Sequence, residues 1–512
     1  MMCCMAPRIA SPIALQADEH ALSVFDPRWL HWGHCVPLRV ESGTLHLAVG
    51  DHPDREQLDE IAFSTGLALQ LLRVDSDALH AALETVRRQF AALARQRDGA
   101  ALLGELSASG ENPSSMQSEV TGVDDAPVVR YLHGLLSEAA RSRVSDIHFE
   151  PFEQFYRVRF RRDGVLAEIA RPPLAVRDRL AARIKVLAEL DIAERRLPQD
   201  GRIRIRLDDG QALDLRVSTL PTLFGEKIVL RLLRDAVAGL AIEQLGLEPD
   251  QQSALLQALD RPHGMLLVTG PTGSGKTLTL YTLLQRLNRE GVNIATAEDP
   301  VEMHLPGINQ VAINDRTGLG FAGALRAFLR QDPDTLMVGE IRDLETADIA
   351  IKAAQTGHRV LSTLHTRDAP GTLARLMNMG IAPFHIAASV RLITAQRLVR
   401  RLCTVCRQPL ALDLDSRRAA GFSGADLEAD WTAWQPTGCP TCDHTGFHGR
   451  IGVHQVMPVS EAMRRLILRR ADVQALSGLA GQEGIRTLHA CGLAKVRAGL
   501  TSLDEIEANC HD

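Results

Sequence analysis

The stretch GPTGSGKT at residues 270–277 has the residue types and the spacing of a loop that binds nucleotide phosphates. Its glycines let successive backbone N–H groups turn toward phosphate oxygens, and the start of the following helix contributes its positive end. Lys276 is expected to reach the β and γ phosphates of ATP, and the Thr277 hydroxyl to bind Mg²⁺. A glycine-rich turn that binds nothing is the alternative, but the apolar strand before it and the helix after it favour a nucleotide site. The residues expected to contact the nucleotide are Gly270, Pro271, Thr272, Gly273, Ser274, Gly275, Lys276, Thr277 and Leu278.

Carboxylates end two short apolar stretches further along the chain. Glu298 and Asp299 follow IATA, and Glu340 follows TLMVG, where a phosphate-handling ATPase usually has Asp-Glu. Ligands collect at the carboxyl ends of strands in open α/β sheets. An acidic pair at a strand end can also be a simple cap. Two carboxylate sources nevertheless suit hydrolysis, which needs one group near Mg²⁺ and another near the attacking water.

Histidines flank the strand-like stretch RVLSTL, with His358 before it and His365 after it. A lone histidine is more often structural than catalytic. The position at a strand end, after the phosphate loop and the acidic strands, favours sensing of the γ phosphate instead. We expect this role for His365 first and for His358 second.

Four of the nine cysteines form two Cys-x-x-Cys pairs separated by 32 residues. Two such knuckles make the tetrahedral sulfur site that zinc favours. A redox dithiol is the alternative, but two matched pairs favour Zn²⁺, and with no further ligand or base nearby the metal is expected to be structural. The expected ligands are Cys403, Cys406, Cys439 and Cys442.

The elements that position these residues form several domains. From residue 264 to about 395, strand-like and helix-like stretches alternate, which predicts a parallel sheet covered by helices. Before it, alternating strands at 156–164, 202–207, 213–219 and 227–233 indicate a second α/β domain. An amphipathic helix precedes these strands, with one apolar face made of Val128, Leu132, Leu135, Leu136 and Ala139. Residues 22–97 predict a small mixed domain, with a strand at 44–50 and helices at 55–66 and 77–96.

Composition limits the classes of function. The 512 residues are 45% hydrophobic and 23% charged, as in an ordinary soluble protein. A net charge of −6 does not suit a protein that coats nucleic acid, so no nucleic-acid partner is expected. No apolar run of membrane-spanning length and no signal-peptide core occur, so a cytoplasmic chain is expected.

Several segments together resemble the ATPases of the type II secretion and type IV pilus superfamily, and among them the type II secretion ATPases of the GspE family. GPTGSGKTLTLY, AEDPVE, TLMVGEIRD and STLHT resemble their Walker A, Asp box, Walker B and His box. SDIHFEP and LRVST upstream and GCPTC downstream extend the resemblance over roughly residues 128–510.

The resemblance implies an α/β fold with a RecA-like P-loop ATPase core, a preceding PAS-like domain, a small N-terminal domain and a tetracysteine zinc subdomain. The expected divisions are an N-terminal docking domain (1–97), a flexible linker (98–127), the PAS-like domain (128–235), the ATPase domain (236–395), the zinc subdomain (396–456) and a C-terminal helical region (457–512).

The resemblance also implies roles for individual residues. Glu340 would help to place Mg²⁺ and Glu298 would polarise the attacking water, although the two roles could be exchanged. Arginines from the second domain would stabilise the γ phosphate, and the matching positions are Arg202 and Arg216. For Arg204 and Arg206 we expect only a solvated strand face.

The function implied is that of a cytoplasmic homohexamer on the inner face of the inner membrane. It would dock through its N-terminal domain on membrane platform proteins and power pseudopilus assembly for type II protein export. The alternatives are a type IV pilus extension motor, a nucleotide-controlled switch and a DNA-translocating motor. The N-terminal domain shows no Arg-Leu-Gly-led, leucine-spaced pattern of the cyclic-dinucleotide-binding modules found in many pilus motors, which favours secretion.

Overall fold

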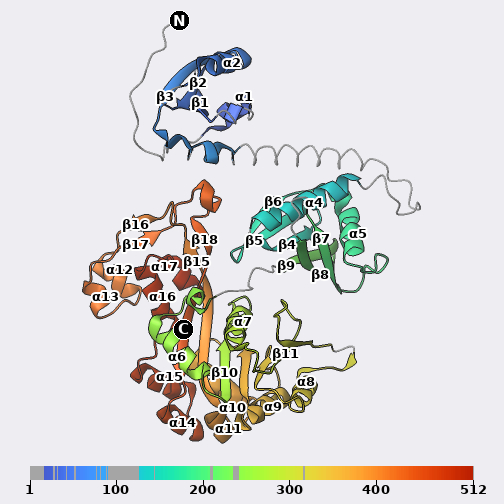
Figure 1. Cartoon of the computed structure of the whole chain (residues 1–512), viewed down its shortest axis with the longest axis vertical. Helices are drawn as coiled ribbons and strands as arrows, with labels where there is room; N and C mark the ends of the chain where they lie inside the picture. Colours follow the sequence, from blue (N-terminus) through green and yellow to red (C-terminus); the bar gives the residue numbers. More distant parts are fainter. Residues whose placement is uncertain are drawn as a thin grey trace.

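The computed structural model describes residues 17–89, 126–207, 212–233 and 241–510, with short gaps at 27–28, 31–32, 42, 51–52, 77, 81, 88, 143 and 315–316. The described residues form three α/β bodies (Figure 1). All but the last two residues of the expected linker, 98–127, lie outside the described part. Within the described part, no helix combines the length and the apolar character needed to cross a bilayer.

The N-terminal body has a three-stranded sheet in the order β1-β2-β3. β1 (Cys35–Glu41) and β2 (Thr44–Val49) are antiparallel, whereas β2 and β3 (Ala68–Arg73) are parallel and α2 (Arg55–Thr65) connects them. The helix α1 (Glu19–Val24) precedes the sheet. The predicted strand at 44–50 and helix at 55–66 are confirmed. The predicted helix at 77–96 is described only up to residue 89, and the described residues from 76 to 89 are helical.

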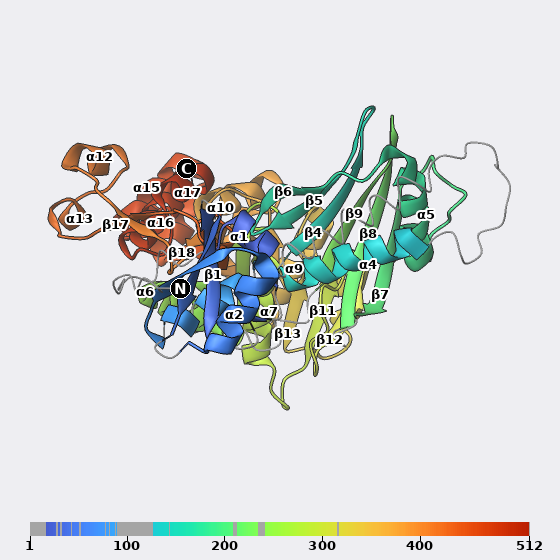
Figure 2. The ribbon, with the colours of Figure 1, turned by 90° about the horizontal axis from the view of Figure 1, so that it is seen from above.

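The second body is a six-stranded antiparallel sheet in the order β6-β5-β4-β9-β8-β7. Its strands are β4 (Val144–Pro151), β5 (Tyr156–Arg162), β6 (Val165–Ala170), β7 (Gln199–Arg206), β8 (Ala212–Thr222) and β9 (Gly225–Leu233). The helices α4 (Ala126–Arg141) and α5 (Arg177–Leu187) pack on one face, where alternate side chains of the strands are apolar (Figure 2). The five residues predicted to form the apolar face of α4 are all buried there. The other face carries charged residues, many of them arginines.

The third body has a seven-stranded sheet in the order β12-β11-β13-β14-β10-β15-β18. All neighbouring strands are parallel except β15 and β18. The strands are β10 (Gly264–Thr269), β11 (Ile294–Glu298), β12 (Asn309–Ala312), β13 (Thr335–Val338), β14 (Arg359–Leu364), β15 (Val390–Leu402) and β18 (Phe447–Pro458).

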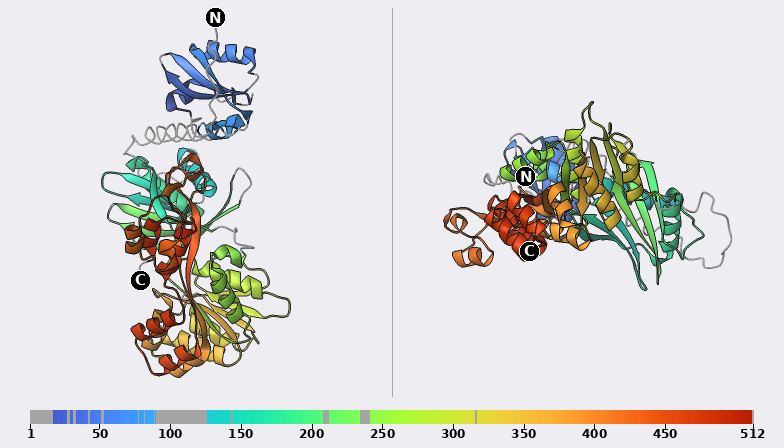
Figure 3. Two further views of the ribbon diagram at one scale, coloured as in Figure 1. Left: turned by 90° about the vertical axis from the view of Figure 1, so that its left-hand side faces the viewer. Right: turned by 90° about the horizontal axis from the view of Figure 1, so that it is seen from below.

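Helices cover both faces of this sheet, which confirms the predicted architecture. One apolar cluster packs α6 (Pro249–Leu259) and α7 (Lys276–Leu287) against one face. A second cluster packs the other helices against the opposite face. These are α8 (Phe321–Phe328), α9 (Leu344–Gln355), α10 (Ala369–Asn378), α11 (Pro383–Ser389), α14 (Glu461–Leu468), α15 (Val473–Gln482), α16 (Leu488–Arg497) and α17 (Leu503–Asn509) (Figure 3).

The ATPase sheet extends past residue 395, where the sequence placed the end of the domain. β15 continues to Leu402, and its antiparallel partner β18 returns from within the segment assigned to the zinc subdomain. The tetracysteine segment is therefore an insertion between two paired strands. It contains β16 (Gln408–Leu410), β17 (Ala433–Gln435), α12 (Leu414–Ala419), α13 (Ala425–Glu428) and a short 3-10 helix at Pro440–Cys442. Arginines at 397, 400 and 401 interrupt the apolar pattern of β15 and conceal its continuation.

Candidate nucleotide site and metal centre

The phosphate loop connects the buried strand β10 to the first turn of α7. Gly275, the residue before α7, has φ +87°, in the region that glycine alone adopts freely. A Cβ on Gly270 would lie 2.5 Å from the backbone oxygen of Gln396, so only glycine fits this position. Lys276 begins α7, and its Nζ donates to the carbonyl oxygens of Gly270 (2.9 Å) and Pro271 (3.0 Å). The lysine thus reaches across the loop where a phosphate would bind.

The Glu340 carboxylate, which follows a different strand, affects Lys276 electrostatically. Burial lowers the pKa of Lys276, while the nearby Glu340 carboxylate acts in the opposite direction and Arg397 adds to the lowering. A Coulombic effect of this kind falls off steeply with distance. Glu340 therefore shares the environment of the phosphate loop, as the sequence predicted for residues at the carboxyl edge of the sheet.

Gln396, on β15, holds the phosphate loop in place and was missed in the sequence. Its side-chain nitrogen donates to the Ser274 carbonyl oxygen (2.6 Å), and its side-chain oxygen accepts from the Thr279 hydroxyl (2.9 Å). Gln396 thus fixes both the end of the loop and the first turn of α7. The signal available was a polar side chain inside the apolar strand LITAQRLV, since buried polar groups are usually paired.

Replacing Gln396 with alanine is expected to lower ATP affinity about tenfold. The substitution leaves the Ser274 carbonyl and the Thr279 hydroxyl without their partner, at a cost of about 1–3 kcal/mol each. The measurement is a titration with a fluorescent ATP analogue. The matched control is Gln455→Ala on neighbouring β18, because Gln455 is also buried but accepts from Ala369 N (2.8 Å) outside the loop. An equal loss of affinity in both variants would contradict the role of Gln396.

Glu298 ends β11 with only 3% of its surface exposed. One carboxylate oxygen accepts from the Tyr281 hydroxyl, and the other accepts from Thr296 (2.6 Å) and Gln310 (3.1 Å). Burial and the bond to Glu298 raise the pKa of Tyr281. Since Tyr281 lies on α7, the helix that begins with Lys276, a hydrogen bond connects the Glu298 carboxylate to the helix of the phosphate loop. This carboxylate is held in one orientation.

Gly339 allows the next strand end to approach Glu298. Its N–H donates to the Ala297 carbonyl (2.8 Å), and a Cβ on Gly339 would lie 3.2 Å from that oxygen and 3.4 Å from the Cα of Glu298. Contacts this short are tighter than ordinary packing. A larger residue at 339, such as the aspartate usual in other ATPases, would therefore press on the strand end that carries Glu298.

Glu340 is the centre of a charged group at the carboxyl edge of the sheet. One of its oxygens lies 3.4 Å from Nε2 of His365, and the other pairs with Arg342. Arg342 also lies 3.9 Å from the Asp299 carboxylate. The structure thus brings together Asp299, Glu340 and His365 from three strand ends, as predicted. Arg342 was missed, although it lies two residues after Glu340 in the same motif.

His358 does not join this group, contrary to the sequence expectation. β14 runs parallel to β10, and Arg359 pairs with Gly264 at the start of β10, whereas the phosphate loop follows the end of β10. His358 and His365 are therefore separated by about 20 Å of strand. The ring of His358 contacts the Ala353 carbonyl (Nδ1 to O, 3.0 Å) at the end of α9. This contact and the strand register place His358 at the end of β14 opposite the phosphate loop.

The two predicted arginines lie side by side on the charged face of the second domain. In the strand register, Arg202 on β7 lies opposite Arg216 on β8. Arg216 in turn lies opposite Arg231 on β9. Arg202 makes a bidentate pair with Asp214 (2.6 and 2.5 Å), which Arg204 joins at 3.1 Å.

Arg231, the last arginine of this row, is close enough to the ATPase domain for one of its carboxylates to affect the pKa of Arg231. A hydrogen bond to Asp146 raises the pKa of Arg231 despite its partial burial, and the Asp146 and Glu302 carboxylates add to the increase. Glu302 follows β11 in the same loop as Asp299, four residues after Glu298. Arg231 is therefore within Coulombic range of the loop that follows β11.

The four expected zinc ligands lie together, with all four sulfurs within 4.8 Å of one another. The sulfur–sulfur separations of the Cys403–Cys439, Cys406–Cys442 and Cys439–Cys442 pairs are 3.8, 3.7 and 3.7 Å. A tetrahedron with Zn–S bonds of about 2.3 Å requires sulfur separations of about 3.8 Å. Backbone N–H groups of Gly438 and Gly446 donate to two of the sulfurs (3.3 and 3.2 Å). The donor set and its geometry fit zinc, whereas a disulfide would need about 2 Å.

Replacing Cys442 with serine is expected to reduce bound zinc from one ion per chain to a small fraction of that value. A serine hydroxyl is a poor substitute for a thiolate, and structural zinc sites need their complete ligand set. Colorimetric metal release from purified protein measures the change. Cys491→Ser is the control, because this buried cysteine lies outside the cluster and receives a hydrogen bond from Gln251. Full zinc content in Cys442→Ser would contradict the assignment.

Comparison with known proteins shows which family this chain belongs to. The family model described as type II/IV secretion system protein matches residues 121–508. The chain belongs to this family. A second model, the MshEN domain, matches residues 7–98.

Relatives of this secretion-family chain cover most of its length. The type IV pilus assembly ATPase PilB of Pseudomonas aeruginosa is 46% identical over 92% of this chain and 83% of its own length. The type II secretion system ATPase E of Vibrio cholerae is 43% identical over 86% of this chain and 87% of its own. The structure of the ATPase DotB of Legionella pneumophila shares the fold, with a TM-score of 0.55 and 19% identity over 77% of this chain and 97% of its own. The chain is therefore an ATP-hydrolysing P-loop enzyme, and membership of the family implies ATP and Mg²⁺.

Proposed function

We propose that this chain is the extension motor of a type IV pilus, an ATPase that powers pilus assembly. The proposal rests on the fraction of this chain that aligns with each group of relatives. PilB proteins of P. aeruginosa and Acinetobacter baylyi align with 92% and 97% of the chain, whereas type II secretion proteins E of Aeromonas hydrophila and Dickeya dadantii align with 75%. The MshEN domain match at residues 7–98 adds a family assignment for the N-terminal domain.

This proposal replaces our expectation of type II secretion, which relied on a missing sequence pattern in the N-terminal domain. Secretion stays the second candidate because one secretion ATPase, that of V. cholerae, is 43% identical over 86% of the chain. Sequence identity alone does not discriminate between the two machines, since PilB of P. aeruginosa and protein E of A. hydrophila are both 46% identical to the chain over their aligned residues.

The chemistry we propose is common to both candidates. The phosphate loop and Lys276 bind the phosphates of ATP, and Thr277 with Glu340 provides oxygen ligands for Mg²⁺, which would neutralise charge on the phosphates. Glu298 orients the attacking water, and His365 lies beside Glu340, where it can respond to the γ phosphate. Arg202 and Arg216 approach the γ phosphate when the second domain closes on the ATPase domain. Closure and release then convert hydrolysis into domain rotation.

We further propose a homohexamer on the cytoplasmic face of the inner membrane, docked through its N-terminal domain on platform proteins. Support comes from the family, whose motors combine these parts. Zn²⁺ at the four cysteines stabilises the insertion between β15 and β18.

A deletion strain tests the choice of machine. The expected result is loss of surface pili with unchanged secretion of exoproteins, restored by the wild-type gene but not by a Lys276→Ala copy. Loss of exoprotein secretion with normal pili would instead support the secretion candidate. Binding of ATP without phosphate release, even with the platform present, would support a switch, and stimulation of hydrolysis by DNA would support a DNA motor.

A further inference from the structure

The β5–β6 turn of the second domain contacts the segment that carries the last two zinc ligands. Arg162, which ends β5, donates to the Asp443 carboxylate at 2.7 Å. Gly449 N donates to the Asp163 carboxylate at 3.1 Å, and Arg450 lies 3.9 Å from the same group. The hydrogen-bonded residues are 281 and 286 positions apart in the sequence, so these contacts join two domains.

The zinc ligands determine the shape of the surface that meets this turn. We call residues 439–449 the zinc knuckle. Asp443 directly follows Cys442, and both Asp443 (φ +48°) and His444 (φ +59°) have left-handed backbone conformations. Two consecutive non-glycine residues in this region are strained and persist only where their surroundings restrain them. A metal that fixes the sulfurs of Cys439 and Cys442 would supply this restraint, and with it the orientation of Asp443.

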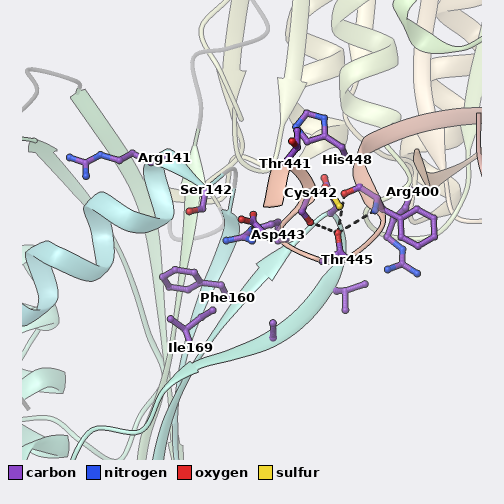
Figure 4. A pocket seen from close by; sticks show the side chains of 15 residues that line it. Arg141, Ser142, Phe160, Ile169, Arg400, Thr441, Cys442, Asp443, Thr445 and His448 are labelled. Carbon is purple, nitrogen blue, oxygen red and sulfur yellow. Dashed lines mark hydrogen bonds and ion pairs between the residues drawn. The ribbon is translucent and has the colours of Figure 1, made fainter. Parts of the chain in front are cut away.

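The contact is polar at its rim and loosely packed inside. A cavity of about 270 Å³ lies between the two domains, with Phe160 and Ile169 on one side and Asp443 and Thr445 on the other (Figure 4). Phe447 also lines it. Ile169 and Val165 keep 37% and 49% of their surface exposed. Protein interiors are packed without such spaces. Exposed ion pairs contribute up to about 1 kcal/mol each, so this contact can break without unfolding either domain.

We propose that the zinc knuckle is a reversible docking surface for the β5–β6 turn of the same chain, and that bound zinc shapes the knuckle for this contact. Charge complementarity carries the assignment, since Arg162 faces Asp443 while Asp163 faces Gly449 N and Arg450. Through this contact, the tetracysteine insertion would help to set the position of the second domain relative to the ATPase domain. The proposal holds for a pilus motor and for a secretion motor alike.

Chemical crosslinking of the full-length protein tests the proposal. In an Arg162→Lys variant, a water-soluble carbodiimide can join the new amine to the Asp443 carboxylate as an amide, and the carbodiimide takes up the water released. Mass spectrometry on assemblies mixed from ¹⁴N- and ¹⁵N-labelled chains then reports whether the two linked peptides come from one chain. We expect single-isotope linked peptides, with a yield that falls at least fivefold after zinc is removed by a chelator.

Two controls accompany this test. Adding Asp443→Asn should remove the linked peptide, and Arg171→Lys should give a zinc-independent link to Glu168, because that pair (2.5 Å) lies wholly within the second domain. Linked peptides of mixed isotope would assign the contact to a neighbouring copy and overturn the proposal. A yield at Asp443 that does not depend on zinc, or no link there while Arg171→Lys gives its link, would overturn it as well.

Discussion

Replacing Lys276 with alanine is expected to lower ATP turnover at least about a thousandfold, equivalent to about 4 kcal/mol of transition-state stabilisation. The Lys276 ammonium lies over the loop, within hydrogen-bond distance of the Gly270 and Pro271 carbonyls, and comes from the first residue of α7. In phosphoryl transfer the protein contributes almost entirely by positioning and by charge stabilisation. Alanine keeps the helix but removes the positive charge that we propose to bind the β and γ phosphates.

Release of inorganic phosphate by the purified protein measures this effect, and thermal unfolding shows whether the fold is retained. The control is Lys352→Ala on α9, an exposed lysine that pairs with Asp348 (2.6 Å). Turnover of the control should stay within about twofold of the unmodified protein. If Lys276→Ala kept a tenth or more of the activity, the loop would not be the catalytic phosphate site.

The phosphate loop could be predicted from sequence because its function depends on local backbone geometry. Glycines at 270, 273 and 275 all adopt positive φ values, and the strand and helix around them follow in register. Glu298, Glu340 and His365 were found for a related reason, since each lies at or just after the carboxyl end of a short apolar strand and parallel strands end at one edge.

The errors arose where the signal is not local. His358 and His365 both flank β14, and the hydrophobic pattern of a strand does not say which of its ends meets the phosphate loop. Gln396 reaches the loop from a strand more than 110 residues away, a contact that only the pairing of β15 with β10 creates. The boundary at 395 failed because the arginines of β15 break the apolar alternation while the strand continues to Leu402.

The division of labour between the two glutamates leads to the second large expected effect. Glu298→Gln is expected to lower turnover about a hundredfold to a thousandfold with ATP binding nearly unchanged. The Glu298 carboxylate accepts from Tyr281, Thr296 and Gln310, and an amide presents a donor in place of one acceptor. The side chain then loses both its fixed orientation and the charge that would polarise water. Stability should fall as well, by about 1–3 kcal/mol for the donor left unpaired.

Tyr281→Phe separates these two consequences, because it removes one donor and leaves the Glu298 carboxylate in place. We expect it to cost stability but to lower turnover less than tenfold. Steady-state phosphate release and analogue binding, measured for both variants, provide the comparison. Equal losses of turnover would mean that Glu298 acts by packing rather than by its charge.

Glu340→Gln should change the magnesium dependence of the reaction instead. Glu340 lies between the Arg342 guanidinium and the His365 ring and within Coulombic reach of Lys276. Loss of its charge should raise the Mg²⁺ concentration for half-maximal turnover several-fold, because Mg²⁺ is a hard cation and binds a charged carboxylate oxygen more strongly than the neutral amide oxygen of glutamine. The control is Glu345→Gln, an exposed residue at the start of α9 that pairs with Arg326. If Glu298→Gln shifted the Mg²⁺ requirement and Glu340→Gln did not, the two roles would be exchanged, and Glu340 would be the residue that acts on water.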